Sequence, residues 1–306
     1  VTIGAVEKYI TETAWENGWV KPRLPRQEID QSVGIIGAGP AGLAAAEMLR
    51  AKGYQVHVYD RYDRVGGLMI YGIPNFKLEK SVVERRTEQL IAQGIEFHLN
   101  YEIGRKASLD DLRDKHDAVL IATGVYKARE APMPGIGLAG VAPALDYLTA
   151  SNRKGLGDAV AAFDEGILDA AGKKVVVIGG GDTAMDCVRT AIRQGAEAVT
   201  CMYRRNKANM PGSQREVKNA EEEGVHFEWL AAPEAVLGDN HARAVRAQRM
   251  HLGMPDATGR QKPEPVPGSA FNTDADLVIM ALGFDPEDLP TLFGAPELPV
   301  SRWGTV

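Results

Sequence analysis

Cysteine is scarce in this chain, which has 306 residues and contains only Cys187 and Cys201. Two cysteines cannot build a disulfide framework, a zinc site of four thiolates or an iron–sulfur cluster. They do not form a Cys-x-x-Cys pair either, which argues against a redox-active disulfide. We therefore expect both to be packing thiols, because a free cysteine usually behaves as a small apolar side chain.

Basic tracts and long apolar runs are absent as well. The chain carries 35 Lys+Arg against 41 Asp+Glu, a formal net charge of −6, which makes it a poor candidate for binding nucleic acid or a membrane surface. No apolar run reaches the roughly 18–20 residues of a membrane span, and no apolar core of a signal peptide is present near residue 1. The histidines show no metal-ligand spacing. We expect a cytoplasmic protein with no metal site and with neither a nucleic-acid nor a membrane partner.

The chain does contain an internal repeat, in which Val33–Gly42 aligns without a gap with Val175–Ala184. Each copy reads as a short apolar strand, a glycine-rich turn, a helix and a second strand. This is the βαβ unit that opens a doubly wound sheet. A spacing of roughly 140 residues is too long for a solenoid and indicates two copies of one domain type. The predicted fold class is α/β, with two Rossmann-like doubly wound dinucleotide-binding domains.

The glycines of both copies stand where the phosphates of a dinucleotide bind. Gly37 allows the tight turn of the first copy. Gly39 and Gly181 let backbone amides reach a pyrophosphate at a helix N-terminus. Gly42 and Ala184 keep helix and strand close together. The alternative, two tight turns that bind no ligand, is disfavoured by the strand–turn–helix context of both.

The two copies differ at the end of the second strand, which decides how a ribose is recognised. Asp60 ends this strand in the first copy, and a carboxylate there accepts hydrogen bonds from ribose hydroxyls and repels a 2′-phosphate. Met202 takes its place in the second copy and is followed by Arg204 and Arg205, whose guanidinium groups suit a phosphate. A solvated arginine pair is the alternative. FAD in the first domain and NADPH in the second is the economical combination, since a flavin accepts hydride from a reduced nicotinamide.

The candidate site residues follow from these positions and from the loops at the strand ends. For FAD they are Gly37, Gly39, Pro40, Ala41, Gly42, Asp60, Gly67, Thr123 and Gly124. For NADPH they are Gly179, Gly181, Asp182, Thr183, Ala184, Arg204 and Arg205. A carboxylate beside a pyrophosphate is unfavourable, so Asp182 is expected to cap its helix or to contact the other domain. No catalytic acid or base is assigned, because hydride transfer depends on positioning.

The expected domains are a helical segment with a linker over 1–30, an FAD-binding domain over 31–145, an NADPH-binding domain over 146–285 inserted in it, and a return segment over 286–306. Helices are predicted over 41–52, 81–94 and 213–224, and strands over 95–99, 118–121 and 275–281. We predict strands within 240–254, a proline-rich loop over 262–268 and a polar inter-domain crossing over 151–172.

Three segments, 66–80, 179–193 and 203–224, are more specific than the glycine motifs. On them the chain resembles the small (beta) subunits of bacterial NADPH-dependent glutamate synthases, within the wider family of flavoproteins with two dinucleotide-binding domains. The resemblance covers nearly the whole chain. It implies that NADPH reduces FAD, and that electrons then leave through iron–sulfur clusters to a large (alpha) subunit that forms glutamate from glutamine and 2-oxoglutarate. Two alternatives stay open: a reductase module of the NADPH–ferredoxin or pyrimidine-dehydrogenase type, and a dinucleotide-binding assembly fragment without turnover.

The resemblance also implies segments without a counterpart in this sequence. The family's cysteine-rich cluster-binding segments precede the position of Val1, so [4Fe-4S] clusters are expected only in a preceding part of a longer polypeptide or in the partner. The family's FAD domain is completed by a C-terminal segment with a second flavin-contacting motif. We therefore expect a fragment truncated at both ends that binds FAD weakly or not at all. A stoichiometric flavin in the purified fragment would contradict this expectation.

Overall fold

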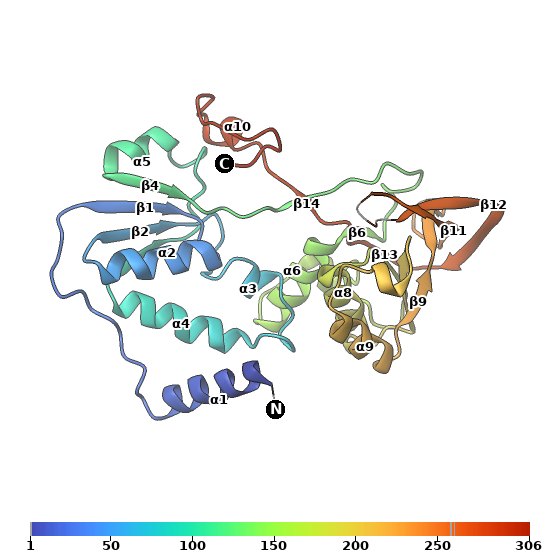
Figure 1. Ribbon diagram of the computed structural model, residues 1–306, viewed down its shortest axis with the longest axis horizontal. Coiled ribbons are helices and arrows are strands. Elements are labelled where there is room, and N and C mark those ends of the chain that lie inside the picture. The colour runs from blue at the N-terminus through green and yellow to red at the C-terminus, as the bar shows by residue number, and fades with distance from the viewer. Residues whose placement is uncertain (1, 258, 260) are drawn as a thin grey trace. The chain divides into compact units, whose positions relative to one another are not determined.

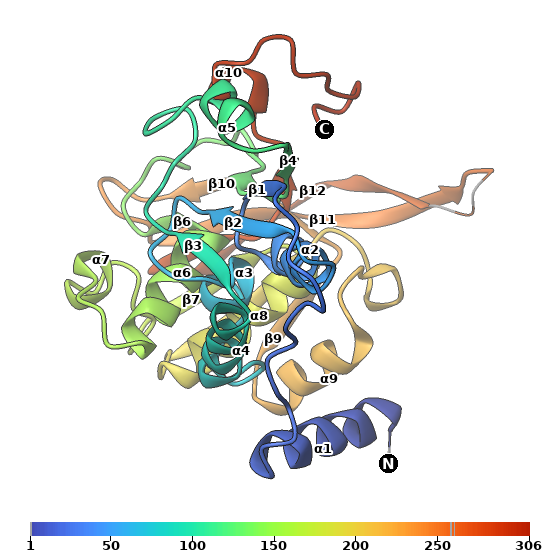
Figure 2. The same ribbon diagram turned by 90° about the vertical axis from the view of Figure 1, so that its left-hand side faces the viewer.

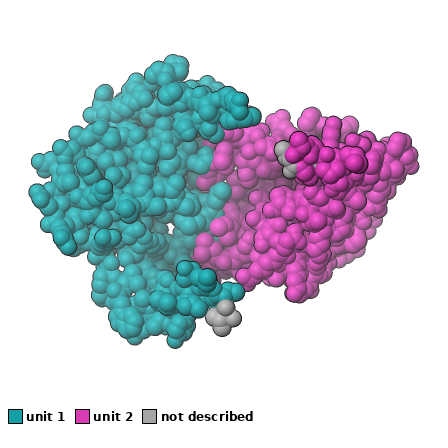
Figure 3. Space-filling model, viewed as in Figure 1, with its two compact units in different colours: residues 1–70, 80–124, 288–306 teal, residues 71–79, 125–287 magenta. Residues whose placement is uncertain are grey.

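The computed structural model describes residues 2–257, 259 and 261–306. The chain divides into two compact units, which Figure 3 colours separately. Unit 1 contains Val1–Ile70, Lys80–Gly124 and Asp288–Val306, and unit 2 contains Tyr71–Glu79 and Val125–Glu287. Unit 2 is therefore inserted in the chain of unit 1.

Unit 1 is built on a four-stranded parallel sheet with the order β3-β2-β1-β4. The strands are β1 (Ser32–Ile36), β2 (Gln55–Tyr59), β3 (Ile95–His98) and β4 (Ala118–Ile121), and the helices are α1 (Ile3–Glu16), α2 (Pro40–Ala51), α3 (Leu68–Tyr71), α4 (Lys80–Ala92), α5 (Leu109–Lys115) and α10 (Leu289–Phe293). Alternate strand residues point to opposite faces, so Ile35 and Val58 pack toward α2 and α4 (Figure 1). Ile36 and Tyr59 pack on the opposite face with side chains of α5 and α10.

Unit 2 contains a five-stranded parallel sheet with the order β6-β13-β7-β8-β9. Its strands are β6 (Val141–Pro143), β7 (Lys174–Ile178), β8 (Ala198–Tyr203), β9 (His226–Trp229) and β13 (Leu277–Met280), and its helical elements are α6 (Ala144–Gly155), α7 (Ala161–Asp164), α8 (Asp182–Arg193), η1 (Lys207–Asn209) and α9 (Gln214–Glu222). Helices α6, α8 and α9 bury one face, which contains Val175 and Val177. The antiparallel strands β10 (Ala231–Leu237), β11 (Ala244–Pro255) and β12 (Gln261–Asp274) cover the other face, and β11 and β12 form a long hairpin (Figure 2).

The predicted α/β class with two dinucleotide-binding-type domains is confirmed. The segments β1–α2–β2 and β7–α8–β8 repeat the same parallel βαβ unit. None of the helices in the described residues is long and apolar enough to cross a membrane.

The boundary between the units lies at Gly124/Val125, earlier than the expected 145/146. Strand β6 pairs with β13 in the sheet of unit 2. The short β5 (Lys127–Ala128) pairs with β14 (Phe284–Asp285), so the two connecting segments run antiparallel. The expected polar crossing over 151–172 contains the end of α6 and the whole of α7 instead.

The proline-rich segment 262–268 was wrongly predicted as a loop, because it lies inside β12. Pro263 and Pro265 stand opposite Leu252 and Met250 of β11. β12 is an edge strand of its three-stranded sheet. Proline is tolerated there because one side of an edge strand needs no N–H donor.

Candidate functional site

Both glycine turns begin with a glycine at positive φ that lies close to another backbone segment. Gly37 has a φ of 113° and Gly179 a φ of 150°. A Cβ on Gly37 would lie 2.4 Å from the carbonyl oxygen of Ala122, and one on Gly179 would lie 2.2 Å from that of Ala281. Only glycine combines a positive φ with so close an approach of another backbone segment. The fold therefore requires glycine at both positions.

The helices that follow these turns begin without a side-chain cap. Gly39 and Gly181 are the N-cap residues of α2 and α8, and neither helix start receives a side-chain hydrogen bond. A Cβ on either glycine would meet no atom within 4 Å. Free backbone amides and the positive end of the helix dipole favour an anion at such a position. Each turn consequently fits a pyrophosphate.

The first turn of α2 brings the glycine loop and the helix into direct contact. Pro40 and Ala41 are exposed, and proline has no amide hydrogen, so the amides of Ala41 and Gly42 are the donors available there. A Cβ on Gly42 would lie 1.9 Å from the carbonyl oxygen of Gly37. The second copy has Ala184 at the equivalent position, so a methyl group fits there, and this residue is fully buried.

Asp60 is held against the first glycine turn. Its Oδ2 accepts a hydrogen bond from the amide of Ala38 at 2.6 Å, and its Oδ1 accepts one from the amide of Tyr62 at 2.8 Å. The side chain is buried, and burial raises the pKa of this carboxyl despite the two hydrogen bonds, which lower it. Each oxygen keeps a lone pair for a ligand hydroxyl.

The remaining FAD candidates surround the same turn. The amide of Gly66 donates to the carbonyl of Ala38 at 2.9 Å, which holds Gly67 beside the turn. The Cα of Thr123 would lie 3.2 Å from a Cβ on Gly37, and Gly124 follows with a positive φ of 71°. All nine FAD candidates therefore lie on or next to the β1–α2 turn.

A cavity of about 700 Å³ opens beside the second turn, within unit 2. Its lining contains five of the seven NADPH candidates: Gly179, Gly181, Thr183, Arg204 and Arg205. Met202 also lines it, so no carboxylate occupies the position equivalent to Asp60. Ala184 is buried under the turn.

Arg204 and Arg205 bring positive charge to this cavity. Arg204 is exposed and Arg205 is half-buried. The Nε atom of Arg205 is buried, yet it has no hydrogen-bond partner in the described part of the chain. Both side chains line the cavity, and guanidinium groups form strong charged hydrogen bonds with an oxyanion. The residues present therefore fit a phosphate group.

Other polar residues near the turn have partners within the protein. The expectation that Asp182 caps its helix is wrong, because α8 has no side-chain cap. Oδ1 of Asp182 instead accepts a hydrogen bond from the amide of Ser213 at 2.9 Å, which fixes the loop before α9. Asp182 is absent from the cavity lining. Nζ of Lys207 donates to both oxygens of Glu221, at 2.6 and 2.7 Å. Among the residues that line the cavity, Arg204 and Arg205 supply positive charge and Glu130 supplies a carboxylate.

Sequence reasoning missed part of the cavity. Its lining also includes Arg129–Met133 and Ala281–Gly283. A signal for the second group was present, because Ala122-Thr123-Gly124 in the first copy has a counterpart in Ala281-Leu282-Gly283. Arg129–Met133 precede β6 and carry no repeat or motif.

Both cysteines are fully buried, as predicted for packing thiols. The Sγ–H of Cys201 donates to the carbonyl of Gly179 at 3.4 Å. Burial raises the pKa of Cys201 to about 12 and raises that of Cys187 as well. Neither thiol is a nucleophile at neutral pH, because the reactive species is the thiolate.

An ion-pair network anchors α8, whose N-terminus forms the second turn. Glu223 accepts hydrogen bonds from Arg189 at 2.8 Å and from Arg193 at 2.5 Å. These hydrogen bonds, that of Arg193 first, lower the pKa of Glu223 to about 2. Glu223 therefore has a structural role, since it joins α8 to the end of α9.

The substitution Glu223→Gln is expected to lower the free energy of unfolding by about 1–2 kcal/mol at pH 7, because charged hydrogen bonds are lost. A lowered pKa in the folded state stabilises the protein above the unfolded-state value of about 4.3. The difference between wild type and variant should therefore shrink as the pH falls from about 4.5 toward 2. Urea unfolding at a series of pH values measures it, with the exposed Glu222→Gln as the matched control. A difference that does not change with pH would contradict the assignment.

The sequence profile of the pyridine nucleotide-disulphide oxidoreductase family matches residues 31–306. The chain belongs to this family. It is 67% identical over 306 residues to the glutamate synthase [NADPH] small chain of Azospirillum brasilense, a match that covers 100% of this chain and 64% of the relative. It is 65% identical to the putative glutamate synthase [NADPH] small chain of Cereibacter sphaeroides, covering 100% of this chain and 73% of that relative.

These matches confirm the resemblance to glutamate synthase small subunits and the oxidoreductase class predicted from the sequence. The chain spans about 64% of the length of the Azospirillum relative. A solved structure, Mycobacterium tuberculosis FprA in complex with NADPH, matches with a TM-score of 0.70 at 19% identity and covers 83% of this chain and 71% of that chain. At this identity the match supports the fold.

Proposed function

We propose that this chain binds FAD at the β1–α2 turn of unit 1 and NADPH in the cavity of unit 2, as the electron-input part of an NADPH-dependent glutamate synthase. The observation that carries the proposal is the cavity, which combines an uncapped helix N-terminus at Gly181 with the side chains of Arg204 and Arg205. The identity to relatives named glutamate synthase [NADPH] small chain supports the choice of reaction.

In unit 2, the amides at the start of α8 would bind the pyrophosphate of NADPH, with Gly181 and Thr183 lining the cavity. Arg204 and Arg205 would bind the 2′-phosphate through charged hydrogen bonds. The absence of a carboxylate at Met202 removes the repulsion that this phosphate would meet. The cavity would therefore select NADPH over NADH.

In unit 1, the amides of Ala41 and Gly42 would bind the pyrophosphate of FAD. Asp60 would accept hydrogen bonds from ribose hydroxyls, and its bonds to Ala38 and Tyr62 fix its orientation. A carboxylate in this position would exclude a 2′-phosphate. The two sites would thus bind different cofactors, because a carboxylate stands in one where arginines stand in the other.

When bound, FAD supplies an acceptor for the hydride of NADPH and an outlet for single electrons. The chain's own residues orient the cofactors, and no side chain is assigned as an acid or base. We propose that the electrons continue through iron–sulfur clusters outside this chain to a large subunit, where glutamate is formed from glutamine and 2-oxoglutarate.

The test is an anaerobic visible spectrum of the purified chain, supplied with an excess of FAD and titrated with NADPH or NADH. The excess of FAD offsets the weak binding expected of this chain, so we expect a protein-bound flavin that NADPH bleaches and that NADH bleaches poorly. Bleaching no faster than that of free FAD would contradict the proposal for this chain. Stable binding to a large FMN-containing amidotransferase subunit would then distinguish the glutamate synthase role from that of a ferredoxin reductase-type module.

A further inference from the structure

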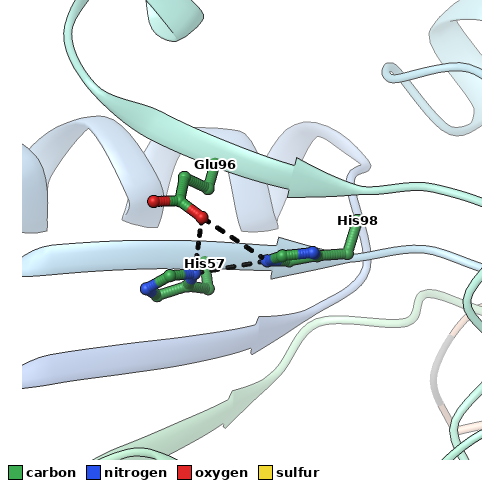
Figure 4. Close-up of side chains that lie close together, drawn as sticks. All are labelled: His57, Glu96 and His98. Atoms are coloured by element: carbon green, nitrogen blue, oxygen red, sulfur yellow. Dashed lines mark hydrogen bonds and ion pairs between the residues drawn. The ribbon is translucent and has the colours of Figure 1, made fainter.

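Three potential metal ligands meet on the sheet of unit 1. His57 lies on β2, and Glu96 and His98 lie on the neighbouring edge strand β3 (Figure 4). His57 and Glu96 are partners in the parallel register, and residues 96 and 98 point to the same face because side chains alternate along a strand. The sequence predicted no metal site, since the pairing of β2 with β3 is not visible from chain spacing.

The donor atoms of this cluster converge on one point. Nδ1 of His57 lies 3.2 Å from Nε2 of His98 and 3.3 Å from Oε2 of Glu96. Nε2 of His98 lies 4.0 Å from the same carboxylate oxygen. Ligands about 2.0–2.1 Å from a tetrahedral zinc ion are about 3.3 Å apart. Two of the three separations already match this value, and a small movement of Glu96, whose side chain is 65% exposed, adjusts the third.

The two imidazole rings are held in place by their surroundings. The ring of His98 stacks on that of Tyr59, with centroids 4.5 Å apart and planes at 14°. The rings of His57 and His116 lie 5.0 Å apart. His116 is not available as a ligand, because its Nδ1 pairs with Oγ of Ser32 at 3.0 Å and its Nε2 with the hydroxyl of Tyr59 at 2.9 Å.

The donor types of the cluster suit a transition-metal ion, because imidazole nitrogen and carboxylate oxygen are both zinc ligands. Glu96 contributes a carboxylate. Lys115 brings a positive charge to the same region, and its Nζ donates to the hydroxyl of Tyr59 at 2.9 Å.

We propose that His57, Glu96 and His98 bind a divalent transition-metal ion, with Zn²⁺ the best fit, and that its fourth position is open to solvent. Two imidazoles and one carboxylate are a zinc ligand set with a vacant position, whereas Mg²⁺ and Ca²⁺ take oxygen ligands. The bound ion would link β2 to β3 and so fix the edge of the sheet. The proposal is independent of the cofactor assignments.

The test is a titration of the untagged chain with Co²⁺, which reports tetrahedral coordination through its visible absorption bands. We expect a saturable spectrum at one ion per chain that Zn²⁺ abolishes and Mg²⁺ leaves unchanged. The substitutions His98→Gln and Glu96→Gln should each weaken binding by about tenfold or more. The matched control is His251→Gln, in an exposed pair with Glu264 at 3.3 Å, which should leave the titration unchanged.

A second measurement keeps the test decisive if a variant is damaged. Saturating Zn²⁺ should raise the Tm of the wild type by about 5 °C, because it binds only the folded state. Glu96→Gln alters an exposed side chain and should unfold at the wild-type Tm without metal, while losing most of the Zn²⁺-dependent shift. No saturable Co²⁺ spectrum in the wild type, or an unchanged shift in Glu96→Gln, would overturn the proposal.

Discussion

Replacing Arg204 and Arg205 together by alanine is expected to lower the preference for NADPH over NADH by about 5- to 150-fold, the equivalent of ~1–3 kcal/mol in lost charged hydrogen bonds. NADH binding should change little, because NADH carries no 2′-phosphate for these side chains. Equilibrium titration of both nucleotides with wild type and variant measures the effect.

The matched control for this pair is Arg215→Ala on α9. Arg215 is exposed, lies in unit 2 and is absent from the cavity lining. Its removal changes the net charge without touching the proposed phosphate position. If the double variant keeps the wild-type preference, or if Arg215→Ala lowers it equally, the phosphate assignment is wrong.

Two substitutions in the second glycine turn should have opposite consequences. Gly179→Ala places a methyl group 2.2 Å from the carbonyl oxygen of Ala281 at a φ of 150°. It is expected to lower the free energy of unfolding by about 2–4 kcal/mol, through backbone strain and overpacking. Gly181→Ala meets no atom within 4 Å and has a φ of −91°. It should leave stability nearly unchanged.

The binding measurement separates the two roles further. The methyl group of Gly181→Ala would occupy the open space where the pyrophosphate is proposed to lie, so NADPH binding should weaken by about tenfold or more. Urea unfolding and NADPH titration of both variants measure the two effects. A Gly181→Ala protein that binds NADPH as tightly as the wild type would place the pyrophosphate elsewhere.

The features that the sequence predicted are local ones. The repeated strand–turn–helix segments could be predicted because all their signals lie within one short stretch of sequence. Glycine positions and apolar periodicity indicate a βαβ unit within about 30 residues. Asp60 and the Arg204–Arg205 pair could be identified because each follows a predictable strand. These positions needed no knowledge of which distant segments pack together.

The features that the sequence did not predict depend on non-local pairing. Arg129–Met133 reach the cavity only because β5 pairs with β14 and β6 pairs with β13. The cluster of His57 with Glu96 and His98 depends on the register between β2 and β3. Strand β12 was not predicted, because its proline content is typical of a loop. Proline is acceptable there because β12 lies at the edge of its sheet, which the sequence does not reveal.

The insertion of unit 2 has a consequence for the order in which the chain matures on the ribosome. Leu289 and Phe293 are buried beside Ile36 and Tyr59 in the core of unit 1. These two residues are synthesised after all of unit 2, so the core of unit 1 cannot be completed before then. Tyr71–Glu79 and Val125–Glu287 emerge earlier and contain everything that unit 2 packs together. The usual progression of co-translational folding from the N-terminus is thereby inverted. We therefore expect the nascent unit 1 to expose part of its core while unit 2 is being made, since Leu289 and Phe293 are not yet present to cover it.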